Sequence, residues 1–396
     1  MTVAMKQLPL ILCLFLLALG ACRNDPPASA AAATEAEQLE LPPPEEDFGA
    51  SQFKWGYIGP AGQLAIEGRF DDVRPFSDGR AAVRVKGRWG YIDRAGALVI
   101  PIQFQGAWSF SEGWGRVLTY ENKMGFVSPD GSWAAEPKYD DALDFKEGRA
   151  RVRVADKYGF IGPDGALLIP AQYEQASSFE NGYAKVRLDG RYGLIGLDGK
   201  MALPPAYKKV APFSEGLARI QQGGLYGFVD LSGQPIIVPQ FENAQDFNQG
   251  LAPVKQEGRY GLIDKTGAFV VAPEYQQLWY AGESFWGVEK EGRYGFIDAE
   301  GEGIVDPQFE QIYSFENGFA AYRLGRLWGY LDRDGNLLTQ PQFGLAWAFH
   351  EGLARVATHR GIGFIDTLGA LAIPPQENFI DLRDFSEGLA PVQVYR

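Results

Sequence analysis

Residue types that carry chemistry are scarce in this chain of 396 residues. It contains two cysteines, Cys13 and Cys22, and two histidines, His350 and His359. Because no cysteine follows residue 22, the rest of the chain offers neither a disulfide nor a thiol nucleophile. Two histidines are too few for a His-rich metal site, and no Gly-x-Ser-x-Gly nucleophile elbow is present. We therefore expect no metal, no cofactor and no enzymatic activity.

The chain also lacks an excess of positive charge. Its 50 acidic residues outnumber 37 basic ones, which gives a formal net charge of −13 and an isoelectric point near 4.8. A nucleic-acid partner would require a basic stripe along the surface, so none is expected. No segment shows a 3.6-residue apolar period, so we expect little helix.

The N-terminal 21 residues have the pattern of a signal peptide. Lys6 precedes an apolar run from residue 8 to residue 19 that is too short to span a bilayer. The next residues lead to Cys22 in the order Leu-Gly-Ala-Cys, which resembles the lipobox of bacterial lipoproteins. The resemblance implies cleavage before Cys22 and a lipid anchor on its sulfur. Arg23 follows instead of Asp, which favours the outer membrane if the source is Gram-negative; an ordinary secretory signal is the alternative.

Residues 22–51 are predicted to form a tether. They contain two proline runs, an alanine-rich piece and scattered glutamate, with few large apolar residues. Such a segment cannot bury a core, so we expect it to be disordered. The chain therefore divides into a signal peptide (1–21), a lipidated and disordered tether (22–51) and an array of repeats (52–396).

The repeats are marked by an aromatic residue followed by glycine. Eight such pairs occur, at Trp55-Gly56, Trp89-Gly90, Tyr158-Gly159, Tyr192-Gly193, Tyr226-Gly227, Tyr260-Gly261, Tyr294-Gly295 and Trp328-Gly329. Met124-Gly125 and Ile362-Gly363 keep the same phase without the aromatic ring. Successive spacings are 34, 35 and then 34 residues seven times, so the array holds ten repeats.

Each repeat has the pattern of short antiparallel strands. A glycine stands seven residues after the aromatic position in all ten copies, and in six copies Asp precedes this glycine by three residues. Asp-x-x-Gly between apolar runs predicts a tight hairpin in which the glycine has a positive φ. A further strand begins at Leu-Ala-x-Val, as in residues 217–220. We predict an all-β unit, with a three-stranded meander and an ordered connector in each repeat.

These residues resemble the bacterial WG-repeat family, also called KWG repeats. Its unit runs Trp-Gly-Tyr-Ile-Asp-x-x-Gly, then Ile-x-Pro-x-Tyr/Phe, then Phe-x-Glu-Gly-Leu-Ala-x-Val, and the resemblance covers about residues 52–396. It implies a repeat scaffold found on exported bacterial proteins and implies no common reaction. The seventh copy departs from it, because residues 279–286 replace the Phe-x-Glu-Gly motif.

The two ends of the array are complementary. The first copy starts at Phe53 without a preceding Leu-Ala-x-Val strand, and residues 389–396 supply such a strand with no aromatic-Gly strand after it. Pairing the two would complete a sheet and close a ring. Against closure, about 34 residues is short for a propeller blade. We predict a propeller-like toroid, with an open β superhelix as the alternative.

Candidate binding residues lie where the repeat departs from its own pattern. Trp279, Tyr280 and Trp286 are extra aromatics in the seventh copy, and Trp108 and Trp347 stand nineteen residues after the aromatic position of theirs. Exposed aromatics stack on sugars or anchor protein partners. The alternative is that these rings fill gaps in the core.

Basic residues before the aromatic position form a second candidate surface, a ladder for an anionic polymer. The alternative is that they pair with acids on neighbouring strands and protect strand edges. They are Lys54, Arg88, Lys123, Lys157, Arg191, Arg259 and Arg293.

The sequence favours a membrane-anchored, non-enzymatic binding or scaffold lipoprotein of the bacterial cell envelope, which recognises a protein or an envelope polymer such as a polysaccharide. The alternatives are a purely structural envelope protein and a carbohydrate-active enzyme on a propeller-like frame. A pocket that joins two close carboxylates to Trp279 or Trp286 would indicate the enzyme.

Overall fold

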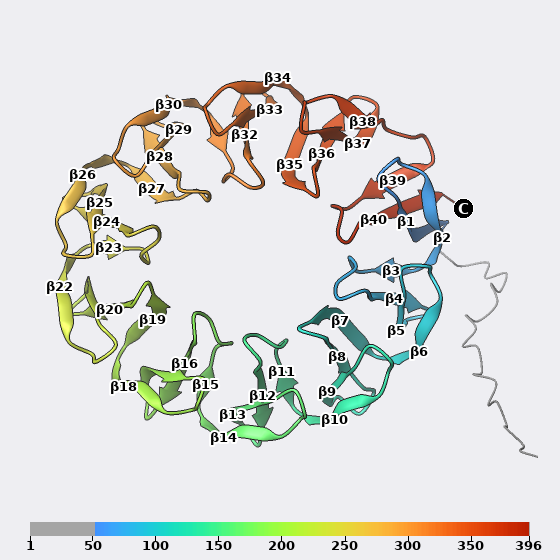
Figure 1. The fold of residues 1–396 in the computed structure, drawn as a ribbon, viewed down its shortest axis with the longest axis horizontal. Coiled ribbons are helices and arrows are strands. Elements are labelled where there is room, and N and C mark those ends of the chain that lie inside the picture. The colour runs from blue at the N-terminus through green and yellow to red at the C-terminus, as the bar shows by residue number, and fades with distance from the viewer. Residues whose placement is uncertain (1–51, 396) are drawn as a thin grey trace, which may run out of the picture. The chain divides into compact units, whose positions relative to one another are not determined.

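The computed structural model describes residues 52–395. The predicted signal peptide, the tether and the lipid attachment at Cys22 lie outside the described residues. Residues 52–395 form ten antiparallel sheets and no helix. The sheets are arranged as the blades of one ring (Figure 1). The predicted all-β propeller-like toroid is therefore confirmed, and the open superhelix is not observed.

Each blade has four strands, which we describe from the centre of the ring outwards (Figure 1). Blade 1 consists of β39, β40, β1 and β2, and blades 2 to 10 follow in chain order from β3–β6 to β35–β38. The innermost strands are β39 (Phe379–Leu382), β3 (Asp72–Val73), β7 (Gly106–Ser111), β11 (Asp141–Ala142), β15 (Gln175–Ala176), β19 (Lys209–Ser214), β23 (Asn243–Ala244), β27 (Gln277–Tyr280), β31 (Gln311–Ile312) and β35 (Leu345–His350).

The second strands carry the Leu-Ala-x-Val sequence and the third strands carry the aromatic-Gly pair. The second strands are β40 (Ala390–Tyr395), β4 (Ala81–Val85), β8 (Trp114–Leu118), β12 (Ala150–Val154), β16 (Tyr183–Leu188), β20 (Leu217–Gln222), β24 (Leu251–Gln256), β28 (Trp286–Lys290), β32 (Phe319–Leu324) and β36 (Leu353–Thr358). The third strands are β1 (Phe53–Ile58), β5 (Arg88–Ile92), β9 (Met124–Val127), β13 (Lys157–Ile161), β17 (Arg191–Gly196), β21 (Leu225–Val229), β25 (Arg259–Asp264), β29 (Arg293–Ile297), β33 (Leu327–Asp332) and β37 (Gly361–Asp366).

The outermost strands follow the predicted Asp-x-x-Gly turn. They are β2 (Leu64–Phe70), β6 (Leu98–Phe104), β10 (Trp133–Tyr139), β14 (Leu167–Tyr173), β18 (Met201–Tyr207), β22 (Pro235–Phe241), β26 (Phe269–Tyr275), β30 (Gly303–Phe309), β34 (Leu337–Phe343) and β38 (Leu371–Ile373). In the turn before β26, the Asp264 carboxylate accepts the N–H groups of Thr266 and Ala268 at 2.8 and 3.0 Å, and Gly267 has a φ of 87°. The turn chemistry is therefore as predicted.

The predicted three-stranded meander is wrong by one strand. The segment treated as a connector contributes the innermost strand, as in blade 2, where Asp72 and Val73 pair with Arg84 and Val83 of β4. In five blades this strand has two residues. A two-residue strand is too short to show the alternation of apolar and polar residues by which strands are recognised in a sequence. Its shortness also explains how four strands fit into about 34 residues.

The glycine of the aromatic-Gly pair allows two backbones to approach closely. A β-carbon on Gly261 would lie 2.4 Å from the carbonyl oxygen of Val271 on the neighbouring outer strand. The ladder is irregular here, because Tyr260 pairs with Tyr275 and Leu262 with Val271. The outer strand thus bulges over the glycine, and any larger residue would force the two strands apart.

Ring closure uses both ends of the described chain. β1 pairs with β40 over six residue pairs, from Phe53 with Tyr395 to Ile58 with Ala390. Each repeat supplies the two outer strands of one blade and the two inner strands of the next, so one half-blade is left at each end. Blade 1 joins these halves, and the predicted complementarity of the two ends is confirmed.

A belt of hydrogen bonds along the inner loops links neighbouring blades. In every loop between the first and second strands, one non-glycine residue has a φ between 50° and 54°, as Asp78 does at 52°. Seven of these ten residues are acidic, and each of the seven accepts the N–H of a glycine in the next blade. One of these bonds, from the Gly79 N–H to the Glu387 carboxylate at 3.0 Å, links blade 2 to blade 1, where the ring closes.

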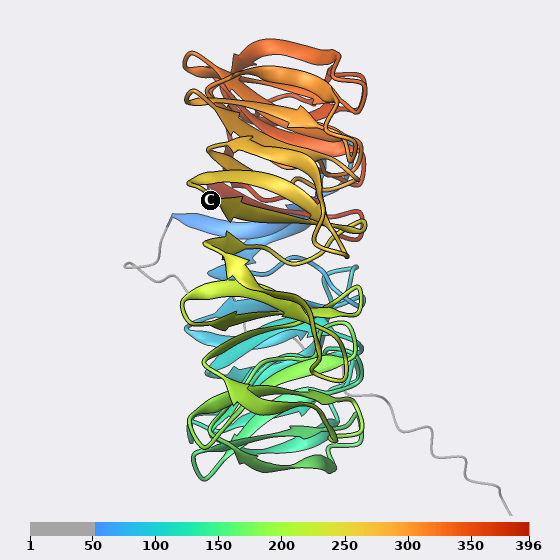
Figure 2. The same ribbon diagram turned by 90° about the vertical axis from the view of Figure 1, so that its left-hand side faces the viewer.

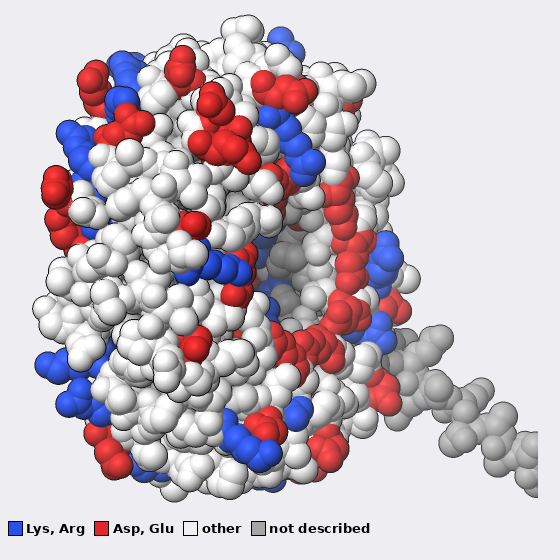
Figure 3. Space-filling model, turned by 60° about the vertical axis from the view of Figure 1, so that its left-hand side comes forward, with Lys and Arg blue, Asp and Glu red and all other residues white. Residues whose placement is uncertain are grey.

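The belt explains where many of the acids of the chain lie. Figure 3 shows acidic side chains along the rim of the central opening. From the side, the blades form a single layer (Figure 2). Because each of these carboxylates holds a neighbouring blade, we assign the rim a structural role.

Candidate functional site

The hydrophobic core lies between blades, in the seams of the ring. The cluster between blades 6 and 7 combines Phe228, Ile237 and Phe241 of one blade with Phe247 and Val254 of the next. The inner end of a seam is closed by a polar contact. At the seam between blades 3 and 4, Arg116 donates to the carbonyl of Ala142 at 2.8 Å and to Asp144 at 2.7 Å.

Seven of the ten seams carry the same contact, in which an arginine or glutamine side chain donates to a carbonyl on the innermost strand of the next blade. The pairs are Arg383 with Val73, Arg74 with Ala107, Arg116 with Ala142, Arg151 with Ala176, Arg219 with Ala244, Gln245 with Leu278 and Arg355 with Leu382. Most of these cations are paired with an acid of the next blade, as Arg219 is with Asp246 at 2.8 Å. A filled seam therefore has its carbonyl and its charge satisfied.

Two of the predicted binding residues support these seam arginines. The guanidinium of Arg116 lies 4.1 Å from the ring centroid of Trp108, and that of Arg355 lies 4.1 Å from Trp347. Both indoles are half-buried. The structure thus places Trp108 and Trp347 against seam cations, where a cation–π contact stabilises the arginine.

The aromatics of the seventh copy lie in blade 8. Trp286 is 0% exposed, so its ring cannot contact a surface ligand. The prediction that Trp286 is a binding residue is therefore wrong. Tyr280 packs edge-on against Trp286 with ring centroids 5.2 Å apart. The half-buried Trp279 covers Gly287, where a β-carbon would lie 2.3 Å from the indole, and packs on the core between blades 8 and 9. Aromatic bulk therefore fills this seam in place of an arginine.

At the seam between blades 9 and 10, a tyrosine takes the position of an arginine. Tyr313 stacks on Trp328 of the same blade with centroids 4.7 Å apart and planes 18° apart. Tyr313 takes the position that Arg383 takes against Trp55 in blade 1, where the guanidinium lies 4.1 Å from the ring. The bond across this seam comes from Tyr330, whose hydroxyl donates to the Trp347 carbonyl on β35 at 2.7 Å. The inner ends of nine seams thus hold an arginine, a glutamine or an aromatic ring.

At its inner end the seam between blades 5 and 6 has no arginine, glutamine or aromatic ring of this kind, although Tyr183 packs on Phe213 across the seam with ring centroids 4.8 Å apart and Asn181 donates to the Phe213 carbonyl at 3.2 Å. Its cation is Lys185 on β16, which makes no hydrogen bond or ion pair to a residue of blade 6 within residues 52–395. The acid that would face it is replaced by Pro212, which stands where Asp144 and Asp246 stand in blades 4 and 7. A cavity of about 390 Å³ opens here.

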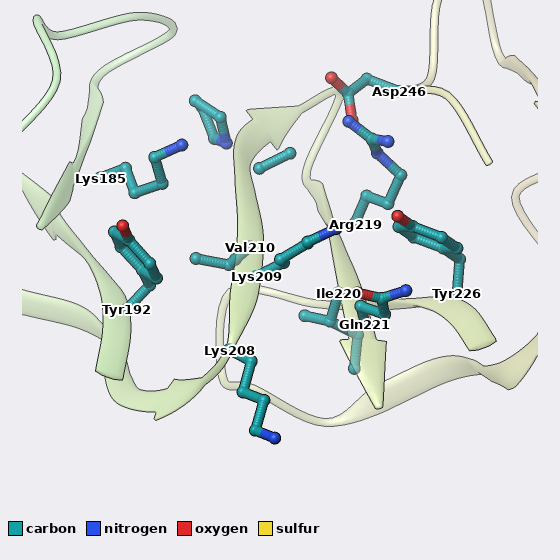
Figure 4. Close-up of a pocket in the computed structure, with 12 residues that line it drawn as sticks. Lys185, Tyr192, Lys208, Lys209, Val210, Arg219, Ile220, Gln221, Tyr226 and Asp246 are labelled. Atoms are coloured by element: carbon teal, nitrogen blue, oxygen red, sulfur yellow. The ribbon is translucent and has the colours of Figure 1, made fainter. Parts of the chain in front are cut away.

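Figure 4 shows the cavity on both sides of β19. Lys185 and Tyr192 lie on one side of this strand, and Arg219, Asp246 and Tyr226 lie on the other. Asp246 is the one carboxylate in the lining, and it is already paired with Arg219. The charge of Lys185 and of Lys209 is therefore not compensated by the lining.

A second cavity of about 600 Å³ adjoins the first and shares Lys208 and Gln221 with it. Its other lining residues are Arg191, Ala206, Tyr207, Gln222, Gly223 and Gly224. Lys208 extends away from Lys185 in Figure 4, into this second cavity. Burial raises the pKa of Tyr207, so its hydroxyl stays protonated at neutral pH and can donate a hydrogen bond. Neither cavity brings two unpaired carboxylates together.

This site was not predicted from the sequence, although a signal for it exists. The residue after the conserved aromatic of the outermost strand is acidic or an amide in seven copies: Asp71, Gln105, Asp140, Glu174, Glu242, Gln276 and Glu310. In the fifth copy it is Lys208. The ladder of basic residues, in contrast, pairs in part with these acids, as Lys54 does with Asp71 at 2.6 Å and Lys123 with Asp140 at 2.6 Å.

Within the described part of the chain, no cluster of three or more His, Cys, Asp and Glu side chains is placed to hold a metal ion. The same residues, 52–395, include no helix of the length and hydrophobicity that a membrane crossing requires.

Several solved structures resemble this chain at low sequence identity. No curated protein matches the chain. Among solved structures, a eukaryotic initiation factor is 12% identical over 80% of this chain and 94% of its own, with a TM-score of 0.45. The computationally designed Ika8 protein is 12% identical over 69% of this chain and 97% of its own, with a TM-score of 0.35. Apo AztD from Citrobacter koseri is 11% identical over 86% and 98%, with a TM-score of 0.34.

A family model described as WG containing repeat matches the chain ten times. The matches are residues 55–89, 89–123, 124–158, 158–192, 192–226, 226–260, 260–294, 294–328, 328–358 and 362–395. These matches run through all ten blades. The chain therefore belongs to the family of proteins built from WG containing repeats.

Proposed function

We propose that this protein is a non-enzymatic binding scaffold of the bacterial cell envelope, anchored by lipid at Cys22, which holds a protein or envelope polymer at the seam between blades 5 and 6. The observation that carries the proposal is the inner end of this seam. In place of an arginine, a glutamine or an aromatic ring it has Lys185, which makes no bond across the seam, and two adjoining cavities lie beside it. Cations without an acidic partner beside a cavity are typical of a site that binds an acidic group.

Filling the seam tests this function. Pro212→Asp would place an acid beside Lys185, as Asp144 stands beside Arg116 in blade 4. The full chain, purified in detergent, is used to capture components of envelope extracts, with Lys200→Gln as the control. Lys200 is exposed, pairs with Asp198 and lines neither cavity. We expect a component that the wild type and the control retain and that Pro212→Asp loses.

Identical capture by all three chains would contradict the binding function at this seam. It would favour the alternative of a purely structural envelope protein. The melting temperature of each variant shows whether a loss of capture reflects a loss of fold.

The lipid anchor is proposed from the sequence Leu-Gly-Ala-Cys and has a separate test. In a bacterial host, the wild type is expected to incorporate a labelled fatty acid and to sediment with membranes. Cys22→Ser should remove the label, because the attachment sulfur is lost, and should release the chain from membranes. An unlabelled wild type would contradict the anchor and leave the seam proposal untouched.

A further inference from the structure

One carboxylate in blade 2 satisfies two donors at once. Asp71 stands at the start of the inner strand and accepts Lys54 Nζ at 2.6 Å through one oxygen. Its other oxygen accepts the backbone N–H of Lys86, at 2.7 Å, in the hairpin between the second and third strands. A carboxylate at this position therefore joins a cation of the preceding blade to a hairpin of its own blade.

The same arrangement recurs around the ring. Hairpin N–H groups bond to Glu174 in blade 5, to Glu242 in blade 7 and to Gln276 in blade 8. The cation of the preceding blade pairs with Asp140 in blade 4 and with Glu310 in blade 9. We call this residue the connector acid; it is an acceptor wherever it makes these contacts.

Blade 6 keeps the donors and lacks the acceptor. Arg191 is the cation of the preceding blade, and the one hydrogen bond that its side chain makes among the described residues is a 3.4 Å contact to the carbonyl of Ala206. The hairpin is Gly223-Gly224, whose two N–H groups bond to no acceptor within residues 52–395. The place of the connector acid is taken by the exposed Lys208, a third donor.

The space left by the missing carboxylate is open. Gly223 and Gly224 have φ values of 60° and 90°, and a β-carbon on either would have no heavy atom within 4 Å. Successive amides with positive φ can direct both N–H groups to one anion. The 600 Å³ cavity lies against this hairpin and is bounded by Arg191 and Lys208.

We propose that a phosphate or carboxylate group of the ligand occupies the position of the missing connector acid, held by Arg191, Lys208 and the Gly223-Gly224 amides. This inference rests on the proposed function, because it names the ligand class of the same seam. The adjoining 390 Å³ cavity carries Lys185 and Lys209. Two joined cationic cavities suit a ligand with two or more acidic groups.

The negative net charge of the protein favours anion binding at this site over the rest of its surface. The chain carries −13, so anions are repelled by most of its surface and attracted where cations stand unpaired. Around the ring, the connector position contains an acceptor that makes these contacts in blades 2, 4, 5, 7, 8 and 9. Blade 3 has Gln105 there, and blades 1 and 10, which have Ile380 and Gly344, also lack the cation, because Gly361 and Leu327 stand before the aromatic positions. One site per chain is therefore expected.

The test is calorimetric titration of the full chain in zwitterionic detergent with sodium tripolyphosphate and with citrate, at low ionic strength. We expect one site per chain, with an affinity that falls as salt screens the charges. Lys208→Glu restores the connector acid, so it should keep the fold and weaken binding by at least about tenfold. Arg191→Gln should also weaken binding, and Lys200→Gln should leave it unchanged.

The proposal is overturned if neither anion binds, or if Lys208→Glu binds as the wild type does, which would mean an adventitious ion only. If no anion binds and Pro212→Asp still abolishes capture of the envelope component, the binding function stands and the ligand class is wrong. If Pro212→Asp also has no effect on capture, both fail.

Vesicles distinguish the source of the phosphate. The Cys22→Ser full chain is sedimented with vesicles of phosphatidylglycerol or of phosphatidylcholine. Association with phosphatidylglycerol that depends on Lys208 would assign the site to a lipid headgroup. Tripolyphosphate binding without such association would assign it to a soluble anion. The proposal holds in both cases, and the absence of both signals would overturn it.

Discussion

The seams between blades 3 and 4 and between blades 5 and 6 are built from the same repeat, yet their inner ends differ. In the first, Arg116 reaches the Ala142 carbonyl and pairs with Asp144. In the second, Lys185 takes the place of the arginine and Pro212 takes the place of the acid. A compact ammonium lacks the fork of donors with which a guanidinium can serve a carbonyl and a carboxylate together.

The difference between the two seams is the loss of two acids, which leaves cationic side chains without partners at the proposed site. Pro212 removes the partner of Lys185, and Lys208 removes the partner of Arg191 and of the Gly223-Gly224 hairpin. The scaffold on both sides of the seam is otherwise intact, because Tyr192 and Tyr226 keep the aromatic-Gly phase. The proposed site therefore lies where the acceptors of the repeat are missing and its donors remain.

Deletion of residues 389–396 should have the largest effect, because both seams depend on a closed ring. It removes β40 and with it the buried side chains of Leu389, Val392 and Val394. Burial of these groups at about 25 cal/mol per Å², together with the lost pairing of β1, suggests a loss of more than about 5 kcal/mol. Thermal unfolding measures it, and an unchanged melt would contradict ring closure.

Arg116→Ala should have the next largest effect, and it separates the two seams directly. It leaves the Ala142 carbonyl and Asp144 without their donor, which should cost about 2–3 kcal/mol of unfolding free energy. Lys185→Ala in the seam between blades 5 and 6 should cost less than about 0.5 kcal/mol, because that side chain makes no cross-seam bond. Chemical denaturation of both variants tests the contrast, and equal losses would refute it.

Asp71→Lys should convert the connector position of blade 2 into that of blade 6. It removes the pairing with Lys54 and the hairpin bond to Lys86 and sets two cations side by side. Because Asp71 and Lys54 are partly exposed, we expect a loss of about 1 kcal/mol. The same variant should gain a second site for tripolyphosphate; stability and stoichiometry that match the wild type would count against the role of the connector acid.

Lys208→Glu should have the smallest effect on stability, and of the opposite sign. It restores an acceptor for Arg191 and for the glycine hairpin at an exposed site, which should raise the unfolding free energy by up to about 0.5 kcal/mol. Differential scanning calorimetry measures the change. A clear loss of stability would show that Lys208 has a structural role that the cavity does not reveal.

Most of the fold could be predicted because its determinants are local. Asp264 and Gly267 specify a turn by their own chemistry, and ten turns at a fixed spacing specify the array. The complementary ends at Phe53 and Tyr395 could be matched without coordinates. The innermost strands could not, since residues such as Asp72 and Val73 form a strand only because β4 lies beside them.

The binding residues were harder to predict, because an unshared aromatic has the same sequence appearance in a core and on a surface. Trp108 and Trp347 are candidates because most other copies have no tryptophan at this position. Each is followed eight residues later by the arginine on which it stacks, Arg116 and Arg355. The joint occurrence of tryptophan and arginine indicates that these rings pack within the protein. The replacement of the connector acid by Lys208 indicates the proposed site. Its meaning becomes clear only from the structure, where the acid at this position accepts hydrogen bonds from two donors.

A crystal structure of the full chain with tripolyphosphate would show directly whether an anion binds in the seam between blades 5 and 6. We expect one ordered anion in this seam, with oxygens within hydrogen-bond distance of the amides of Gly223 and Gly224 and of the Arg191 guanidinium. An empty seam with anions bound elsewhere, or anions spread without preference over several blades, would contradict it.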